Sequence, residues 1–167
     1  MKYQKYFLSI ITIIILILMF AAGCGQSETT PETSSADTRR DINELCTVLL
    51  NGKYFEDELS LIDTSYCEML LGISDEEYEN VILYMGSGAT SEQFVIFETA
   101  DKEKAAAIKG KCDEYISSQT AAYAEYMPKE VDRLNKACVN VYNDIYVVLC
   151  VASDSDGSEA AISDFFK

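Results

Sequence analysis

A single apolar run near the N-terminus decides which part of this chain can form a folded domain. Lys2 and Lys5 precede an almost wholly apolar run at residues 7–20. The run is about fourteen residues long, whereas a membrane-spanning helix needs roughly twenty. A basic start, a short apolar stretch and the small residues at 21–23 are typical of a secretory signal peptide, which is removed from the mature protein. We therefore expect residues 1–23 to be a signal peptide that takes no part in the fold.

The end of this run, Ala21-Ala22-Gly23-Cys24, resembles the lipobox of bacterial lipoproteins. In that family a diacylglyceryl group is attached to the cysteine thiol, and the cysteine becomes the new N-terminus. The resemblance implies this role for Cys24, although Ala21 stands where the family usually has leucine. An uncleaved anchor and an ordinary cleaved signal remain as alternatives. All three place the rest of the chain outside the cytoplasm, and lipidation of Cys24 implies a protein anchored on the extracytoplasmic face of the cell membrane.

The composition changes abruptly after Cys24, where Ala36 is the only aliphatic residue between Gly25 and Arg40. Such a stretch cannot bury a core, so we expect residues 24–37 to be a flexible tether. Residues 38–167 then form one globular domain, because this length supports a single core.

The charge of the chain is strongly acidic, with 13 basic and 28 acidic residues. Removal of Lys2 and Lys5 with the signal peptide takes the formal net charge from −15 to −17. Nucleic acid is therefore excluded as an expected partner. Anionic headgroups also repel such a domain, so a lipid and not a basic face must supply membrane attachment.

Five cysteines follow Cys24, an odd number for an exported protein, so at least one thiol is unpaired or bridges two chains. The chain has no CxxC motif and no histidine, and a zinc site would have to consist of thiolate and carboxylate ligands alone. We expect no metal and no cofactor, and interpret the cysteines mainly as small buried hydrophobic residues. They are Cys46, Cys67, Cys112, Cys138 and Cys150.

Hydrophobic periodicity in the domain predicts an α+β fold. Helical spacing occurs at residues 37–50, in a long segment from Asp101 to Met127, and at 158–166. Between the first two helices, β-branched and aromatic runs at 81–85 and 93–97 predict two strands of a hairpin with a wide loop. With a second hairpin, we expect four mainly antiparallel strands packed with one long helix and terminal helices. The predicted core includes Val81, Leu83, Phe94, Ile96, Ile108, Val139, Val148 and Phe165.

The second hairpin is predicted at residues 137–142 and 145–151, with Asn143-Asp144 as a two-residue turn. Tyr142 would then oppose Ile145. Side chains alternate between the faces of a strand, so this register places Cys138 and Cys150 on opposite sides of the sheet. We expect no disulfide between them.

Three parts of the domain together resemble the bacterial domain-of-unknown-function family 4358: the segment from Ile73 to Ala105 with its YMGSGAT motif, the segment that begins at Pro128, and the hairpin NVYNDIYVVLCVASD. The similarity runs from about Ile42 to Phe166. The resemblance implies a lipoprotein of Gram-positive bacteria with a small α/β domain. It implies no activity, because none is established for the family.

The best candidate for a binding site is the loop Gly86-Ser-Gly-Ala-Thr-Ser91. It begins like the dinucleotide motif GxGxxG, but it lacks the third glycine and leads into a strand, where that motif requires a helix N-terminus. A structural loop is the favoured interpretation, since glycines are needed wherever strands reverse. Ser87, Gly88 and Thr90 remain the candidate ligand-binding residues.

The other polar motifs give no site. Residues 153–157 resemble the centre of a calcium loop, but its first and last positions fall on Ala152 and Ser163, which lack carboxylates. A turn that caps the last helix is expected there instead. Without histidine the usual serine and cysteine triads have no base, and we predict no catalytic residues.

Three classes of function fit the sequence. The leading one is a surface-tethered binding or interaction module for an envelope protein, a peptide or a small solute. The second is a structural or accessory envelope lipoprotein without a small ligand, and the third is a hydrolase that works without histidine.

Overall fold

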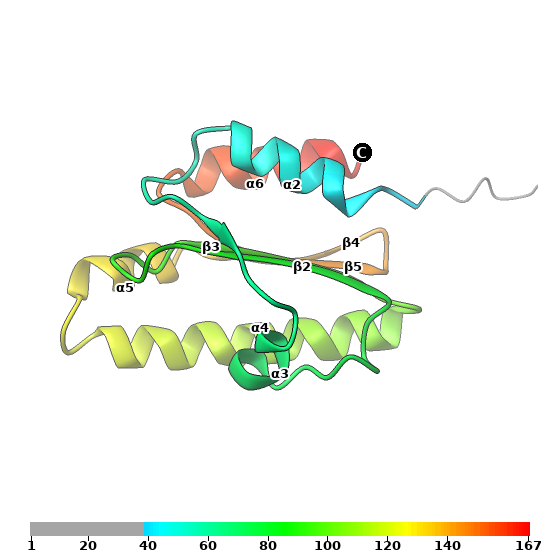
Figure 1. The fold of residues 1–167 in the computed structure, drawn as a ribbon, viewed down its shortest axis with the longest axis horizontal. Coiled ribbons are helices and arrows are strands. Elements are labelled where there is room, and N and C mark those ends of the chain that lie inside the picture. Colours follow the sequence, from blue (N-terminus) through cyan, green and yellow to red (C-terminus); the bar gives the residue numbers. More distant parts are fainter. Residues whose placement is uncertain (1–38) are drawn as a thin grey trace, which may run out of the picture. The chain divides into compact units, whose positions relative to one another are not determined.

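The computed structural model describes residues 39–167, in which five helices accompany a five-stranded antiparallel sheet (Figure 1). The predicted signal peptide, the predicted tether and Cys24 lie outside the described residues. The helices are α2 (Ile42–Asn51), α3 (Tyr66–Leu71), α4 (Lys102–Tyr123), α5 (Pro128–Leu134) and α6 (Ser155–Phe165). The strands are β1 (Ser60–Leu61), β2 (Asn80–Met85), β3 (Gln93–Glu98), β4 (Cys138–Tyr142) and β5 (Tyr146–Val151).

The predicted α+β class is confirmed, but the prediction of four strands is wrong, because β1 adds a fifth. β1 pairs with the end of β2, with Ser60 opposite Met85, and its two residues are too few to show a period of two. Two short helices, α3 and α5, were also absent from the prediction. Pro128 opens α5 at a position where a helix tolerates proline, so the residue that ends the predicted long helix also begins the next one.

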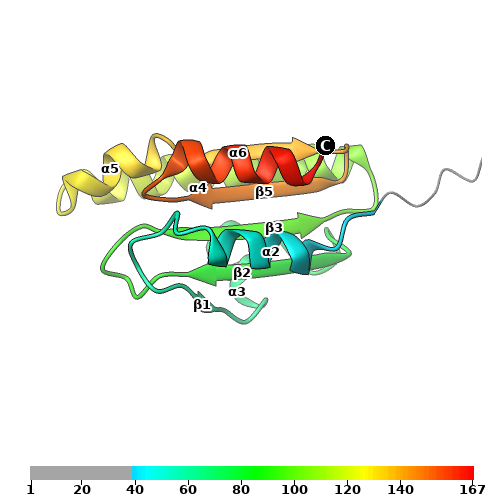
Figure 2. The ribbon, with the colours of Figure 1, turned by 90° about the horizontal axis from the view of Figure 1, so that it is seen from above.

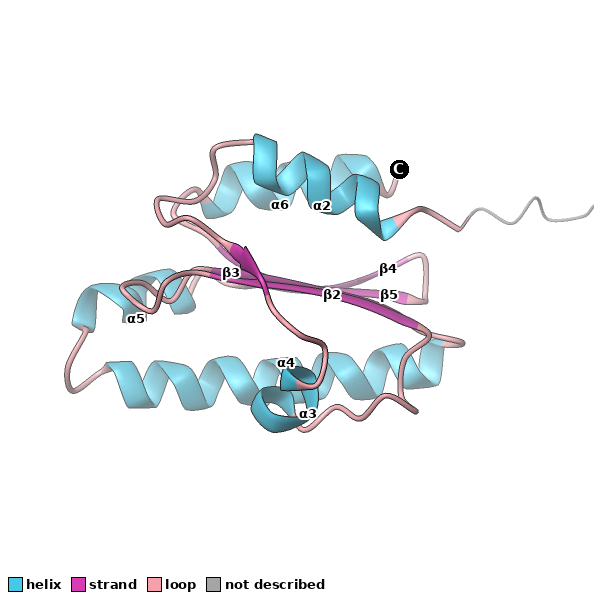
Figure 3. Ribbon diagram, viewed as in Figure 1, coloured by secondary structure: helices cyan, strands magenta, loops and turns pink. Residues whose placement is uncertain are grey.

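Helices cover both faces of the sheet. α2 and α6 lie on one face, and α3 and α4 lie on the other (Figures 1 and 3). Successive residues of β3 point alternately into these two layers: Phe94 and Ile96 contact the α2 and α6 side, whereas Val95 and Phe97 contact the α4 side. β3 and β5 are therefore buried along their whole length. Six of the eight predicted core residues are buried, and the other two, Val139 and Phe165, are half-buried against the same cores.

The register of the second hairpin differs by one residue from the prediction. Asn143 and Asp144 do adopt positive φ, as the turn requires, but Tyr142 pairs with Tyr146 and Ile145 stays in the loop. The backbone amide and the hydroxyl of Thr99 each donate to the Ile145 carbonyl at 2.9 Å, and these bonds hold Ile145 beside the end of β3.

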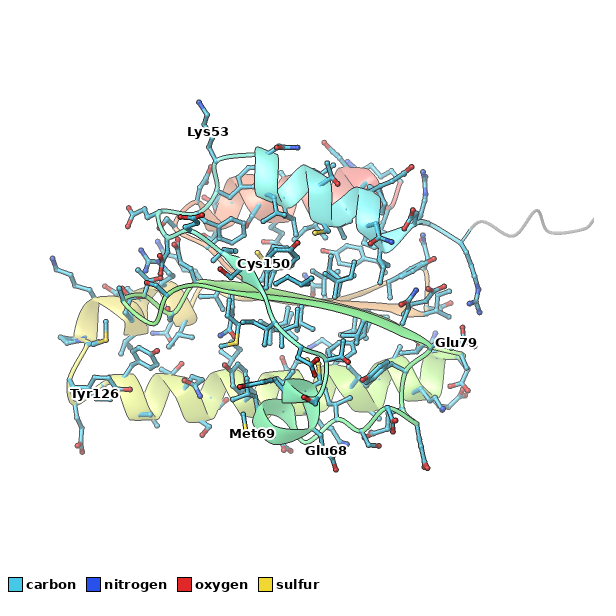
Figure 4. The ribbon with its side chains drawn as sticks, in the orientation of Figure 1. Lys53, Glu68, Met69, Glu79, Tyr126 and Cys150 are labelled. Atoms are coloured by element: carbon cyan, nitrogen blue, oxygen red, sulfur yellow. The ribbon has the colours of Figure 1, made fainter. Side chains whose placement is uncertain are left out.

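The corrected register places two cysteines opposite each other. Cys138 pairs with Cys150, so both side chains lie on the α2 and α6 side of the sheet. Figure 4 labels Cys150 on this side. The argument that they point to opposite faces is therefore wrong. All five cysteines of the described part are buried free thiols, which confirms their interpretation as buried hydrophobic residues.

The order of the strands in the sheet is β1-β2-β3-β5-β4. The two hairpins lie side by side through β3 and β5, and β4 forms one edge of the sheet (Figure 2). At the other edge, β1 covers only part of β2. Within residues 39–167, the sheet is thus open along β4 and along the beginning of β2.

Candidate functional site

The predicted binding loop between β2 and β3 is folded around a carboxylate that the sequence did not point to. The Oδ2 atom of Asp57 accepts hydrogen bonds from the Ser87 amide and hydroxyl, both at 2.9 Å, and from the Thr90 hydroxyl at 3.1 Å. The hydroxyl of Ser87 and the other donors hold the pKa of Asp57 below its ordinary value. Any anion that used the Ser87 and Thr90 donors would first have to displace Asp57.

The two glycines of this loop, Gly86 and Gly88, are required for different structural reasons. A Cβ atom at Gly86 would lie 2.5 Å from the Asp57 carboxylate, so only glycine allows this close approach. Gly88 has a φ of +90°, which side-chain-bearing residues rarely adopt. Both glycines are explained by the folding of the loop, and the role of Ser87, Gly88 and Thr90 in ligand binding stays a prediction.

A second carboxylate, that of Glu92, is fully buried where the same loop enters β3. It accepts hydrogen bonds from the backbone amides of Glu56, Asp57 and Ser153 at 2.7 to 3.1 Å, and from the Ser153 hydroxyl at 2.6 Å. Its two oxygens thus join three segments that are far apart in the sequence.

Helix α5 adds an ion pair to this group. Glu130 accepts hydrogen bonds from the Ser91 amide and hydroxyl, both at 2.8 Å, and pairs with Arg133. Burial raises the pKa of Glu130, but these hydrogen bonds and the charge of Arg133 outweigh it and hold the pKa below its ordinary value. The Arg133 guanidinium also lies 3.8 Å from Glu92 and donates to the Ser153 hydroxyl at 2.8 Å.

We call Asp57, Glu92, Glu130 and Arg133 the carboxylate cluster. Every carboxylate in it is already hydrogen-bonded to protein donors, and Glu92 has no exposed surface. General acid–base chemistry needs a group that can reach a substrate proton. Among residues 39–167, no three acidic or cysteine side chains are placed to hold a metal ion. The cluster therefore acts as a structural clamp at the loop end of the sheet.

A groove of about 590 Å³ runs beside β4, at the edge of the sheet. One wall is a face of α4 that presents Asp113, Ile116, Ser117 and Thr120, spaced so that they share one side of the helix. The other residues that line this β4 groove are Leu134, Asn135, Ala137, Cys138, Val139, Asn140 and Glu159. It therefore lies between the α4 layer, the edge strand and α6.

The β4 groove combines an apolar floor with polar walls. Ile116 and Val139, both partly buried, supply apolar surface, and Asp113 and Glu159 supply the two charged groups. Glu159 accepts a hydrogen bond from the side-chain amide (Nδ2) of Asn140 at 3.3 Å. Along an edge strand, alternate residues direct their backbone N–H and C=O groups away from the sheet. The groove thus offers unpaired backbone groups beside apolar surface, which is the chemistry of strand addition.

A smaller groove of about 440 Å³ lies at the opposite edge, between α2, β1 and the beginning of β2. β1 and the following residue occupy part of that edge, since the amide of Ile62 donates to the Leu83 carbonyl at 2.9 Å. Neither groove was predicted, because strand order, and hence which strands form edges, could not be inferred from the sequence.

The chain was compared with curated proteins, solved structures and protein families. No curated protein and no solved structure matches the chain. In the described residues, no helix is both long and apolar enough to span a membrane. One family does match, over residues 54–152, which include the loop of the carboxylate cluster and the β4 strand. Because this match covers more than half of the chain, the protein belongs to the family described as Domain of unknown function (DUF4358).

Proposed function

We propose that this chain is a lipid-anchored binding module, held on the extracytoplasmic face of the cell membrane through Cys24, that captures a protein or peptide partner. The apolar run at residues 7–20 and the small residues before Cys24 support the anchor. The polar composition of residues 24–37 supports a tether that lets the domain reach its partner.

The observation that carries the binding role is the β4 groove. A volume of about 590 Å³ falls in the range of ordinary ligand sites. Its apolar floor is bordered by an edge strand, and edge strands recognise extended segments through backbone hydrogen bonds. The predicted loop at Ser87 and Thr90 is the weaker candidate, because Asp57 already occupies its donors.

The groove is tested by photo-crosslinking in the native cell. A photo-crosslinking amino acid replaces Ser117, which lines the groove, and in a matched control it replaces the neighbouring exposed residue Ser118, which does not. We expect a discrete crosslinked product from position 117 that is absent from position 118. Equal amounts of crosslinked product from both positions, or no product from position 117, would show that the groove is not the binding surface.

The anchor is tested separately by the mass of the protein extracted from its native membrane. We expect a chain that begins at Cys24 and carries a diacylglyceryl adduct, and we expect a Cys24→Ala variant to lose it. An unmodified N-terminus would leave the binding role intact but reject the lipid anchor.

A further inference from the structure

The edge strand β4 lacks the features that usually protect a sheet edge from other chains. Such edges carry lysine or proline, are very short, or are covered by another element. β1, at the opposite edge, has only two residues. β4 has five, Cys-Val-Asn-Val-Tyr, with no charge and no proline among them. No further strand pairs with its outer side in the described chain, and after the first residue its side chains are only partly buried.

The charge around this edge discriminates between partners. Among the described residues, no lysine or arginine lines the β4 groove, whereas Asp113 stands on the α4 wall and Glu159 on the α6 side. Asp113 pairs with Lys109 at 2.8 Å outside the groove, so of these two carboxylates Glu159 is the one without a basic partner in the described chain. The whole chain carries a formal net charge of −15. Two copies of the chain therefore repel each other at long range, and a basic segment is attracted.

We propose that the β4 groove binds a basic, extended segment of an envelope protein, which adds to β4 as a sixth strand of the sheet. This inference rests on the proposed binding function and specifies the partner. Side chains of the added strand point alternately to its two sides. On one side they meet Asp113 and Ile116 of α4, and on the other they meet Glu159 of α6. The fitting segment therefore has lysine or arginine on both sides and aliphatic residues between them.

The spacing of a sheet fits this arrangement. An added strand lies about 4.8 Å from β4, and five paired residues extend over roughly 17 Å. Backbone hydrogen bonds supply affinity that does not depend on sequence, and the carboxylates supply the preference for cations. We expect binding to weaken as salt rises, because Asp113 and Glu159 are both exposed.

Binding is measured with the full chain in a mild detergent and a fluorescent peptide of about ten residues, long enough to cover β4. In this peptide pairs of lysines alternate with pairs of valines, so that lysine points to both sides of the added strand. Two control peptides separate the contributions. In the first, glutamate replaces lysine. In the second, every second backbone amide is N-methylated, which retains the charge but removes the donors on one edge. We expect each change to weaken binding at least about tenfold, because strand addition requires both attraction and backbone pairing.

Matched variants locate the site. Asp113→Asn and Glu159→Gln should each weaken binding of the lysine peptide about two- to fivefold at low salt. Glu114→Gln, next to Asp113 on α4, and Asp164→Asn on α6 lie outside the groove and should leave binding unchanged. Hydrogen exchange at the backbone amides of residues 138–142 should slow when the peptide is bound.

Each result tests one part of the proposal: strand addition, the location of the site, or the nature of the occupant. Equal binding of the N-methylated peptide would overturn strand addition, and equal effects of the control variants would overturn the location. Failure of the lysine peptide, together with a crosslink from position 117 in cells, would reject a basic strand and keep the proposed binding function. Concentration-dependent dimerisation that the Asp113→Asn variant strengthens would identify a second copy as the occupant and overturn the proposal.

Discussion

The loop end of the sheet and its β4 edge contain similar polar groups but leave them in opposite states. At the loop end, the buried carboxylate of Glu92 accepts hydrogen bonds from three backbone amides and a hydroxyl. At the β4 edge, Asp113 and Glu159 are exposed, and the edge strand has no neighbour on its outer side among the described residues. The carboxylate cluster thus uses its polar groups to join segments of the chain, whereas the groove keeps its two carboxylates at the surface, in exposed contacts with Lys109 and Asn140.

This difference shows why a cluster of polar residues is a poor guide to a binding site. Satisfied hydrogen-bond networks rigidify a fold, and removing one member leaves the others without partners. A ligand must compete with those internal bonds, whereas at an open edge it competes only with water. Changes in the cluster should therefore affect stability, and changes in the groove should affect binding.

The largest effect is expected from Glu92→Gln. The amide side chain presents N–H groups to the donors that now face a carboxylate, and it leaves Arg133 with one fewer charged partner. We expect a loss of about 3 kcal/mol in the free energy of unfolding. Urea unfolding of a Cys24→Ala chain, which carries no lipid, measures it. The exposed Glu58→Gln control should change stability by less than about 0.5 kcal/mol. Equal values for the two variants would show that Glu92 is not a clamp.

A somewhat smaller loss is expected from Gly86→Ala. The new Cβ atom would lie 2.5 Å from Asp57 Oδ2 and 3.3 Å from the Glu92 carbonyl oxygen, so the loop has to shift. We expect a cost of about 1 to 3 kcal/mol. Gly110→Ala is the matched control, because it lies in α4 with no neighbour within 4 Å of a Cβ atom. That control should gain about 0.5 to 1 kcal/mol, and the same sign for both variants would contradict the packing argument.

The sequence predicts the parts of the fold that depend on periodicity. Both hairpins, α2, α4 and α6 are long enough to repeat an apolar pattern. The predicted strand ends agree to within one residue, whereas α2 begins five residues later and α4 ends four residues earlier than predicted. β1 and α3 have two and six residues, too few for a pattern to show. The register error came from Ile145, which is held out of the second hairpin by Thr99, a residue 46 positions away. Local turn chemistry cannot report such a contact.

The candidate site was predictable only in part. The glycines and hydroxyls of the loop at 86–91 were visible in the sequence, but their partner Asp57 lies 30 positions before Ser87. The β4 groove depends on strand order, which no local pattern encodes. β4 itself even suggests an interior strand, since it carries no charged residue. Both failures have one cause: whether a polar group is free depends on contacts between distant segments.

Acid should weaken the carboxylate cluster. The pKa of Asp57 and that of Glu130 are held below their ordinary values in the folded chain. Their stabilisation is therefore complete above the ordinary carboxylate range of about 4, and is lost as the pH falls through the lower folded values. As the pH is lowered from about 5 to about 3, we expect the urea concentration at the unfolding midpoint to decrease. The decrease should be smaller in a Glu130→Gln variant, which has one titrating carboxylate fewer. An unchanged midpoint over this interval would contradict the proposed role of these hydrogen bonds.

The smallest change in stability is expected from the groove itself, where Asp113→Asn and Glu159→Gln should each alter the free energy of unfolding by less than about 0.5 kcal/mol. The Asp113 side chain forms an exposed pair with Lys109 at 2.8 Å, and the Glu159 side chain accepts a hydrogen bond from the Asn140 side chain at 3.3 Å. Exposed contacts of this kind contribute little, because water replaces them readily. The same urea experiment checks both variants beside Glu92→Gln. A loss near that of Glu92→Gln would mean that these carboxylates also hold segments together, and the distinction between a closed loop end and an open edge would then fail.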